Sequence, residues 1–538
     1  MTRSRLAWLV PLALCLVHAT LFGAWIVDDA GISFAYARNL AHGYGLVSQP
    51  GQPPVEGFSN PLWTFALVPA FWAGWFDPVW TPKIVAAGCI GLAFALLARL
   101  AGRSPSASPV AIGVGLGVVA LATPFVAWSF SGLENALSVL LVAAAAERSE
   151  RLLAVEPRRG SGALLGLALA AAALTRPDAV LFVTALPLLL LIGLVARRSA
   201  RPLAAALLVA AVVWGGVYGG FLLWRRWYFG DWLPNTYYAK GGPHATDVFA
   251  LLTLRPDSVA RWLEAAWGAA GPLGGWLLAG LGIALVLCLA HRTLSPALAV
   301  VAVYLGIAGA AYVLLPRDWM PEFRFATPFV ALFPLACTLA AGDLLSRAQS
   351  ARGARLKRGL AITAAVAAVL TFLPRSLTFA AAPTVPFADV VRAYGDGFNR
   401  MADELGVRQG AVLLPDVGGT LWASRLRVVD LGKLCDRTIA RTMGKDQRAF
   451  YDYVFDRTTP VFIHFHGAWS AMARLDSDPR FERDYVPLLE YEDDWFRKMT
   501  GATVRAGDFV RRDIAAAHPI EVAAIRQELA VQHALGKR

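Results

Sequence analysis

Two adjacent carboxylates stand where an apolar N-terminal run gives way to polar sequence. Asp28 and Asp29 directly follow the apolar residues from Leu6 to Val27. Two neighbouring carboxylates cannot both ionise comfortably near a medium of low dielectric constant, so one of such a pair can keep its proton more tightly. A carboxylate of that kind suits a general base. The alternative is a solvated pair that only ends the apolar run, and the dipeptide alone favours this alternative.

The sequence around the pair is polar and punctuated by glycine. Helical spacing places Tyr36 and Arg38 within about two turns of Asp29. Glu56 and Asn60 follow in a second polar stretch that can return towards the first. A loop of this composition is typical of a catalytic or binding site. It therefore favours a chemical role for the carboxylate pair.

Long apolar segments make up most of the rest of the chain, and they must position this loop. The chain has 538 residues, of which 57% are hydrophobic and 16% are charged, whereas soluble proteins average about 25% charged residues. The apolar residues come in blocks of about 20, which matches the thickness of a bilayer core. This composition excludes a single soluble core and a disordered chain. It predicts a polytopic α-helical membrane protein.

The positive charge of the chain has a simple explanation in a membrane protein. The formal net charge is +12, and most arginines lie in short clusters between apolar blocks. Such clusters set the orientation of a chain in the membrane. No zinc knuckle, basic helix or RNA-binding signature occurs, so nucleic acid is not an expected partner. The five cysteines have no paired spacing and indicate neither a disulfide framework nor a thiolate metal site.

The apolar runs predict about eleven membrane spans. Basic clusters fall in alternate connections, so the N-terminus is expected in the cytoplasm and the first outer loop, residues 28–82, outside. The apolar, tryptophan-rich segment 61–76 would reverse every later orientation if it were a span. We expect it to be a re-entrant or interfacial helix, although the sequence does not decide between spanning and re-entering. The expected spans are 6–27, 83–100, 109–128, 133–146, 161–175, 178–196, 203–224, 271–290, 296–315, 325–345 and 359–378.

Charged residues return after about residue 380. Short apolar segments alternate there with helical ones, over a length sufficient for an independent core. We therefore expect a transmembrane domain over residues 1–378 and an extracytoplasmic soluble α/β domain over residues 379–538. The expected strands are Ala411–Leu414, Arg427–Leu431 and Val461–Phe465, and the expected helices are 386–405 and 517–533.

Several short motifs together resemble a known family. Residues 25–65 contain Asp-Asp after the first span, Tyr-Ala-Arg-Asn-Leu, Gly-x-Gly-Leu-Val, Val-Glu-Gly and Asn-x-Leu-Trp. This block resembles the GT-C glycosyltransferases, integral membrane enzymes that use polyprenyl-phosphate sugars on the outer face of the membrane. Within them it is most similar to relatives of the mycobacterial terminal arabinofuranosyltransferase. The resemblance continues more loosely in Ser131–Glu134, Thr175–Asp178, Leu233–Lys240 and Pro321–Phe325.

The resemblance implies roles for individual residues. In the family, a carboxylate of the first outer loop removes the proton of the acceptor hydroxyl in an inverting transfer. That role falls here on Asp29 or Asp28, with Asp29 preferred. A phosphate leaving group needs cationic or backbone donors, and the candidate donor-phosphate ligands are Lys240, Arg324, Arg176 and Arg317. The candidate substrate contacts are Glu56, Asn60, Tyr36, Arg38, Glu134, Tyr237 and Tyr238.

A metal site receives little support from the sequence. His464 and His466 lie on one face of an expected strand, a spacing that suits two metal ligands. No third ligand pairs convincingly with them, so a structural strand with one polar face is the preferred interpretation. A lipid-monophosphate donor also demands a divalent cation less than a nucleotide diphosphate does. No cofactor is expected, and a divalent cation is allowed but not indicated.

The leading hypothesis is an inverting glycosyltransferase of a bacterial-type cytoplasmic membrane. It would move a sugar, including a furanose such as arabinofuranose, from a polyprenyl-phosphate donor to an extracytoplasmic glycan or lipid acceptor. One alternative is a transporter or flippase of lipid-linked substrates. The sequence shows no pair of related halves, which argues against this alternative. The other is a non-catalytic partner in glycan assembly, against which stand the intact Asp pair and Glu56. An α/β tail differs from the β-rich domain of the mycobacterial arabinofuranosyltransferases, which counts against an arabinan substrate.

Overall fold

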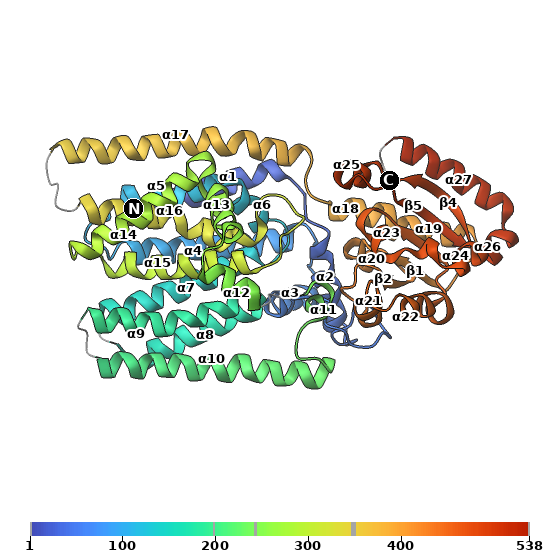
Figure 1. Cartoon of the computed structure of the whole chain (residues 1–538), viewed down its shortest axis with the longest axis horizontal. Coiled ribbons are helices and arrows are strands. Elements are labelled where there is room, and N and C mark those ends of the chain that lie inside the picture. Colours follow the sequence, from blue (N-terminus) through green and yellow to red (C-terminus); the bar gives the residue numbers. More distant parts are fainter. Residues whose placement is uncertain (1–2, 156, 197–199, 242–244, 346–350, 536–538) are drawn as a thin grey trace.

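A helical bundle and an α/β domain lie end to end along the long axis of the molecule (Figure 1). The computed structural model describes residues 3–155, 157–196, 200–241, 245–345 and 351–535. The chain builds the bundle first, and the long helix α17 (Ala351–Ala381) leads from the bundle to the α/β domain.

The bundle confirms a polytopic helical membrane protein. Within the described residues, eight helices are long and apolar enough to cross a membrane. A ninth is added if α5 (Pro109–Leu121) and α6 (Thr123–Ser129) form one span, which bends by 67° beside Pro124 because proline has no N–H to continue the helix. The eight include α1 (Arg3–Ala19), α4 (Trp80–Ala101), α9 (Ala185–Val195), α10 (Ala200–Phe229), α13 (Pro256–Ala270) continuing into α14 (Gly274–Ala290), α15 (Pro296–Leu314), α16 (Thr327–Leu344) and α17.

The expected count of eleven spans is not confirmed. The segments 133–146 and 161–175 fall in α7 (Asn135–Ala154) and α8 (Arg159–Thr175), which belong to the bundle. α7 carries four charged residues in its last third, and α8 is short for a crossing. The segment 61–76 contains α3 (Pro61–Trp72), whose 12 residues span about 18 Å. A straight crossing of the hydrocarbon core needs about 30 Å, so α3 is too short to cross alone.

Polar contacts collect at the two ends of the bundle. At the end facing the α/β domain, the indole of Trp128 donates to the carbonyl oxygen of Glu322. At the opposite end, Arg103 forms ion pairs with Glu147 and Glu150, and Asp343 accepts the backbone N–H of Ser295. The basic residues at the ends of α4 and α7 lie together there, because each of them pairs with Glu147. They are Arg99, Arg103, Arg148 and Arg151.

The α/β domain is built on a mixed sheet of five strands in the order β2-β1-β3-β5-β4. The strands β1 (Ala411–Leu414), β2 (Arg427–Asp430) and β3 (Phe462–Phe465) are parallel and match the expected apolar strands. The strands β4 (Tyr485–Glu492) and β5 (Arg505–Arg511) add an antiparallel edge that the sequence did not predict. Both strands contain charged residues among apolar ones, so neither forms a continuous apolar run.

Helices cover both faces of this sheet. The core on one face joins the sheet to α19 (Gly397–Glu404) and α27 (Pro519–Ala534), and the core on the other joins it to α21 (Arg437–Thr442) and α22 (Gln447–Asp452). Shorter helices connect these elements or extend from the bundle. They are α11 (Asn235–Lys240), α12 (Ala245–Leu252), α18 (Phe387–Val390), α20 (Val417–Ala423), α23 (Gly467–Ala473), α24 (Pro479–Asp484), α25 (Asp494–Thr500) and α26 (Arg512–Ala517).

The α/β domain packs against the first outer loop, chiefly against its helix α2 (Asp29–Ala41). An isolated bridge joins Val27 to Pro386, next to the start of α18. Helix α2 then packs against α20, where Gly31 meets Gly418 so closely that a Cβ on Gly31 would lie 2.5 Å from the carbonyl carbon of Gly418. Two glycines are therefore required for this approach of backbone to backbone, and the loop and the domain form one contact surface.

Candidate active site

Asp29 is the first residue of α2. Its carboxylate faces Arg324, which lies in the turn before α16. Its Oδ2 is 3.2 Å from Nη1 of Arg324. The Nε of the same guanidinium is 2.7 Å from Oδ2 of Asp318. One buried arginine thus contacts two carboxylates, which holds Asp29 in a fixed position.

A second buried arginine repeats this pattern. Arg176, which ends α8, lies 3.2 Å from Oε1 of Glu134 and 3.0 Å from Oδ1 of Asp178. Asn60 donates its side-chain N–H to the other oxygen of Glu134 at 2.8 Å. Three of the expected site residues, Arg176, Glu134 and Asn60, are therefore brought into one network.

The two arginines belong to one cluster, which we call the outer carboxylate cluster. Both guanidinium groups lie over the ring of Phe325, at 4.9 Å for Arg176 and 4.7 Å for Arg324. The cluster holds more carboxylates than guanidinium groups. Its carboxylates are Asp29, Glu134, Asp178 and Asp318, and its cations are Arg176 and Arg324.

Solvent reaches one carboxylate of the cluster far more than the others. The side chain of Asp29 is 32% exposed, whereas the other three carboxylates are at most 11% exposed. Asp29 is therefore the carboxylate of the cluster that is open to solvent. The other three carboxylates are held against the two arginines.

Asp28 has a different environment from its neighbour. Its Oδ1 accepts the N–H of Gly419 at 2.6 Å, and its Oδ2 accepts the N–H of Gly418 at 3.1 Å. Burial raises the pKa of Asp28 well above its usual value, Asp416 and Asp29 add to the rise, and the two N–H donors oppose it. Both oxygens are thus engaged in the contact between the first outer loop and α20.

Glu56 is buried and paired with Arg225 at the outer end of α10. Its Oε2 is 2.7 Å from Nε of Arg225, and its backbone carbonyl accepts the N–H of Asn235 at 3.0 Å. Burial raises the pKa of Glu56 to about 7, although the guanidinium of Arg225 lowers it. Glu56 therefore joins the first outer loop to α10 and α11.

Tyr36 and Arg38 also contact protein groups. The hydroxyl of Tyr36, which is fully buried, donates to the carbonyl of Val55 at 2.5 Å. Arg38 donates to the backbone carbonyls of Leu421 and Trp422 in α20. Tyr36 therefore joins two parts of the first outer loop, and Arg38 holds that loop against the α/β domain.

The remaining expected residues lie on the surface. Lys240 ends α11 and is exposed, and Arg317 is 70% exposed beside Glu264. Tyr237 is 40% exposed, and the ring of Tyr238 lies 5.1 Å from the guanidinium of Arg441. No recorded contact within the described residues joins these four side chains to the outer carboxylate cluster.

Sequence reasoning missed three partners in these networks. Asp318 follows Arg317 in an expected outer connection, and Asp178 lies in a motif that was noted only for Arg176. Arg225 is an arginine at the outer end of an expected span. A charged residue at a span end requires a partner, and that rule would have marked all three.

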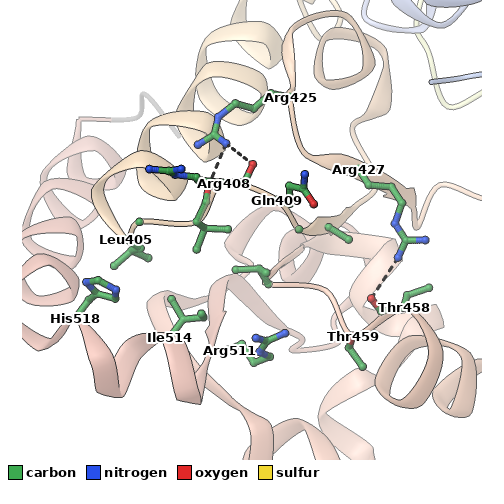
Figure 2. Close-up of a pocket in the computed structure, with 15 residues that line it drawn as sticks. Leu405, Arg408, Gln409, Arg425, Arg427, Thr458, Thr459, Arg511, Ile514 and His518 are labelled. Carbon is green, nitrogen blue, oxygen red and sulfur yellow. Dashed lines mark hydrogen bonds between the residues drawn. The ribbon is translucent and has the colours of Figure 1, made fainter. Parts of the chain in front are cut away.

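A separate hollow of about 720 Å³ opens in the α/β domain. Figure 2 shows Arg408, Arg425, Arg427 and Arg511 around it. It lies at the amino ends of the parallel strands β1 and β3, whereas the contact with Asp28 lies beyond their carboxyl ends. The hollow and the contact with Asp28 therefore lie at opposite ends of these parallel strands.

Comparison with known proteins identifies the fold. No family profile and no curated protein sequence matches the chain. ArnT from Cupriavidus metallidurans, solved with bound undecaprenyl phosphate, has a TM-score of 0.52 and 15% identity, covering 79% of this chain and 86% of its own. The archaeal oligosaccharyltransferase AglB from Archaeoglobus fulgidus, solved with an inhibitory peptide and a dolichol-phosphate, has a TM-score of 0.54 and 12% identity, covering 92% and 74%.

Both neighbours are GT-C membrane enzymes, so the chain has the GT-C fold that its motifs implied. At 12–15% identity the likeness establishes the fold alone.

Proposed function

We propose that this protein is an inverting membrane glycosyltransferase that uses a polyprenyl-phosphate sugar. The observation that carries the proposal is the position of Asp29, the solvent-accessible carboxylate of the outer carboxylate cluster. The GT-C fold supports it, because the two neighbours were solved with undecaprenyl phosphate and a dolichol-phosphate. Neither neighbour's substrate is assigned to this chain by the fold.

In the proposed reaction, Asp29 accepts the proton of the acceptor hydroxyl. The hydroxyl oxygen then bonds to the anomeric carbon of the sugar, while the bond from that carbon to the phosphate oxygen breaks. The polyprenyl monophosphate leaves, and the configuration at the anomeric carbon inverts. Arg324 contacts Asp29 and keeps it in position. In this proposal the same guanidinium also stabilises the departing phosphate.

The other assignments are parts of the same proposal. Asp28 anchors the loop, Lys240 and Arg317 are accessible cations for a lipid phosphate, and Arg176 positions Glu134. The sugar is proposed to be a furanose such as arabinofuranose, on the resemblance of residues 25–65. The acceptor is an extracytoplasmic glycan or lipid, and the enzyme belongs to the cytoplasmic membrane with its α/β domain outside.

The test is sugar transfer by purified protein in lipid nanodiscs. A radiolabelled polyprenyl-monophosphate arabinofuranose is supplied with an oligosaccharide acceptor, beside pyranose donors of the same lipid. Asp29→Asn is expected to lower the transfer rate by about 10²–10⁴-fold, the usual contribution of a general base. The matched control is Asp389→Asn, which changes an exposed aspartate of α18 and should leave the rate unchanged.

Each outcome distinguishes one part of the proposal. Transfer from pyranose donors only would contradict the furanose assignment and keep the enzyme class. Unchanged transfer by a folded Asp29→Asn protein would remove Asp29 as the base. Movement of the lipid-linked sugar across the bilayer without transfer would indicate a flippase, and neither activity would indicate a non-catalytic partner.

A further inference from the structure

Three side chains of the α/β domain gather at the carboxyl ends of two neighbouring parallel strands. Asp416 follows β1, His464 lies in β3, and His466 directly follows β3. One ligand atom from each of the three lies within 4.8 Å of the other two. Oδ2 of Asp416 is 2.8 Å from Nε2 of His466. The pairing of β1 with β3 brings these residues together, although Asp416 and His466 are 50 positions apart in the chain.

One nitrogen of His464 is buried and lacks a partner. Nδ1 lies 2.8 Å from Oδ1 of Asp508, the residue directly opposite on β5. Nε2 has no hydrogen-bond partner among the described residues, and the side chain is only 2% exposed. A buried polar atom without a partner costs about 1–3 kcal/mol. A bound cation would supply the missing partner.

Asp508 orients His464 in the manner of a metal ligand. Histidine ligands usually hold their second ring nitrogen against a carboxylate or a carbonyl, which fixes the ring and directs the other nitrogen to the metal. Asp508 accepts from Nδ1 and leaves the lone pair of Nε2 available. The side chains of His466 and Asp416 are 32% and 19% exposed, so an ion can enter from their side.

We propose that Asp416, His464 and His466 bind a divalent transition-metal cation, with zinc the ion that fits best. Two imidazole nitrogens and one carboxylate oxygen form a donor set that suits zinc, and three protein ligands leave a fourth position for water or a substrate group. Magnesium and calcium prefer sites made of oxygen ligands. The site is independent of the proposed transfer, in which no step uses the ion.

The site lies beside the contact between the α/β domain and the first outer loop. Asp416 precedes α20, whose Gly418 and Gly419 donate to Asp28. The carboxylates of Asp28 and Asp416 are close enough to repel each other. A cation bound by Asp416 offsets this repulsion, so it stabilises the contact that also positions Asp29.

The experiment is a zinc titration of the full-length protein in detergent. The protein carries no polyhistidine tag, is stripped with a chelator, and is titrated by calorimetry. The wild type is expected to bind one Zn²⁺ per chain, and His466→Ala should weaken binding by at least about tenfold. His518→Ala is the matched control, since His518 is a similarly part-exposed histidine of the same domain outside the cluster. It should bind zinc like the wild type.

Two further readouts keep the proposal falsifiable. X-ray absorption of the zinc-loaded wild type should give a nitrogen and oxygen shell at about 2.0–2.1 Å, and a sulfur shell would overturn the assignment. Zinc should raise the unfolding temperature of the wild type and not that of His466→Ala or Asp416→Asn. A folded wild type that binds no zinc, or a His466→Ala protein that binds it as tightly as the wild type, would also overturn the proposal.

Discussion

Asp28 and Asp29 are neighbours of the same chemical type, and their partners give them different roles. Both oxygens of Asp28 accept backbone N–H groups of α20. Asp29 has one guanidinium partner and remains accessible to solvent. A general base needs a lone pair that can reach the proton it removes. Asp29 meets this condition, whereas Asp28 is engaged in holding two parts of the molecule together.

The position of Asp29 depends on the planar guanidinium of Arg324, which contacts Asp29 and Asp318 through different nitrogens. A lysine ammonium is a point charge and cannot reproduce this geometry. We expect Arg324→Lys to lower the rate of sugar transfer by about 10²-fold, the effect of a misplacement of roughly 1 Å. Initial rates at saturating donor measure it.

The control for this prediction is Arg392→Lys, which changes an arginine just after α18 that is 75% exposed. It should transfer sugar at the wild-type rate. Equal rates for Arg324→Lys and the wild type would mean that Arg324 does not position the base.

At the scale of elements, the contact between α2 and α20 fixes where Asp29 lies. Gly418 is required there because a Cβ on it would lie 1.8 Å from the carbonyl oxygen of Asp28. Gly418→Ala therefore forces α20 away from α2, and overpacking of this kind costs about 1–3 kcal/mol. We expect a lower unfolding temperature, faster proteolytic release of the α/β domain, and slower sugar transfer.

A matched glycine substitution isolates the effect of the contact. Gly88 in α4 has no atom within 4 Å of an added Cβ, so Gly88→Ala should leave both stability and proteolysis unchanged. If Gly418→Ala resists proteolysis like the wild type, the contact between the two elements is not what holds the domain in place.

The sequence predicted the strands that contain a short apolar run. The strands β1, β2 and β3 were found because buried parallel strands are short apolar runs. The edge strands β4 and β5 were missed, since they contain Glu490 and Asp508 among apolar residues. Because β5 was not predicted, Asp508 was not recognised as the partner of His464.

The other contacts that could not be predicted from the sequence join segments that are far apart in the chain. Asp416 was not recognised as a neighbour of His466 because adjacency of β1 and β3 is a property of the sheet order. Arg176, Glu134 and Asn60 were chosen individually, and their contact follows from how α3, α7 and α8 pack. The protein contacts of Tyr36 and Arg38 could not be predicted from sequence, since a polar residue in a loop has the same appearance whether it binds a ligand or the protein.

At the scale of the whole molecule, two sets of charged contacts lie at opposite ends of the bundle. The outer carboxylate cluster lies at the end that faces the α/β domain, and the ion pairs of Arg103 with Glu147 and Glu150 lie at the other. Positively charged connections remain in the cytoplasm. A reaction on a lipid-linked sugar with an extracytoplasmic acceptor requires Asp29 at the other surface, so the two arguments give the same orientation.

This orientation can be measured by labelling cysteines in intact cells. Ile520→Cys places a thiol on α27, where Ile520 is 80% exposed, and Val155→Cys places one at the far end of α7, where Val155 is 60% exposed. The proposed orientation has the α/β domain outside and the basic connections in the cytoplasm. It therefore predicts that a membrane-impermeant maleimide labels Ile520→Cys in intact cells and Val155→Cys only after the membrane is opened. The unsubstituted protein gives the background of its own five cysteines. The reverse labelling pattern would place Asp29 in the cytoplasm, where an extracytoplasmic acceptor could not reach it, and would contradict the proposed reaction as well as the topology.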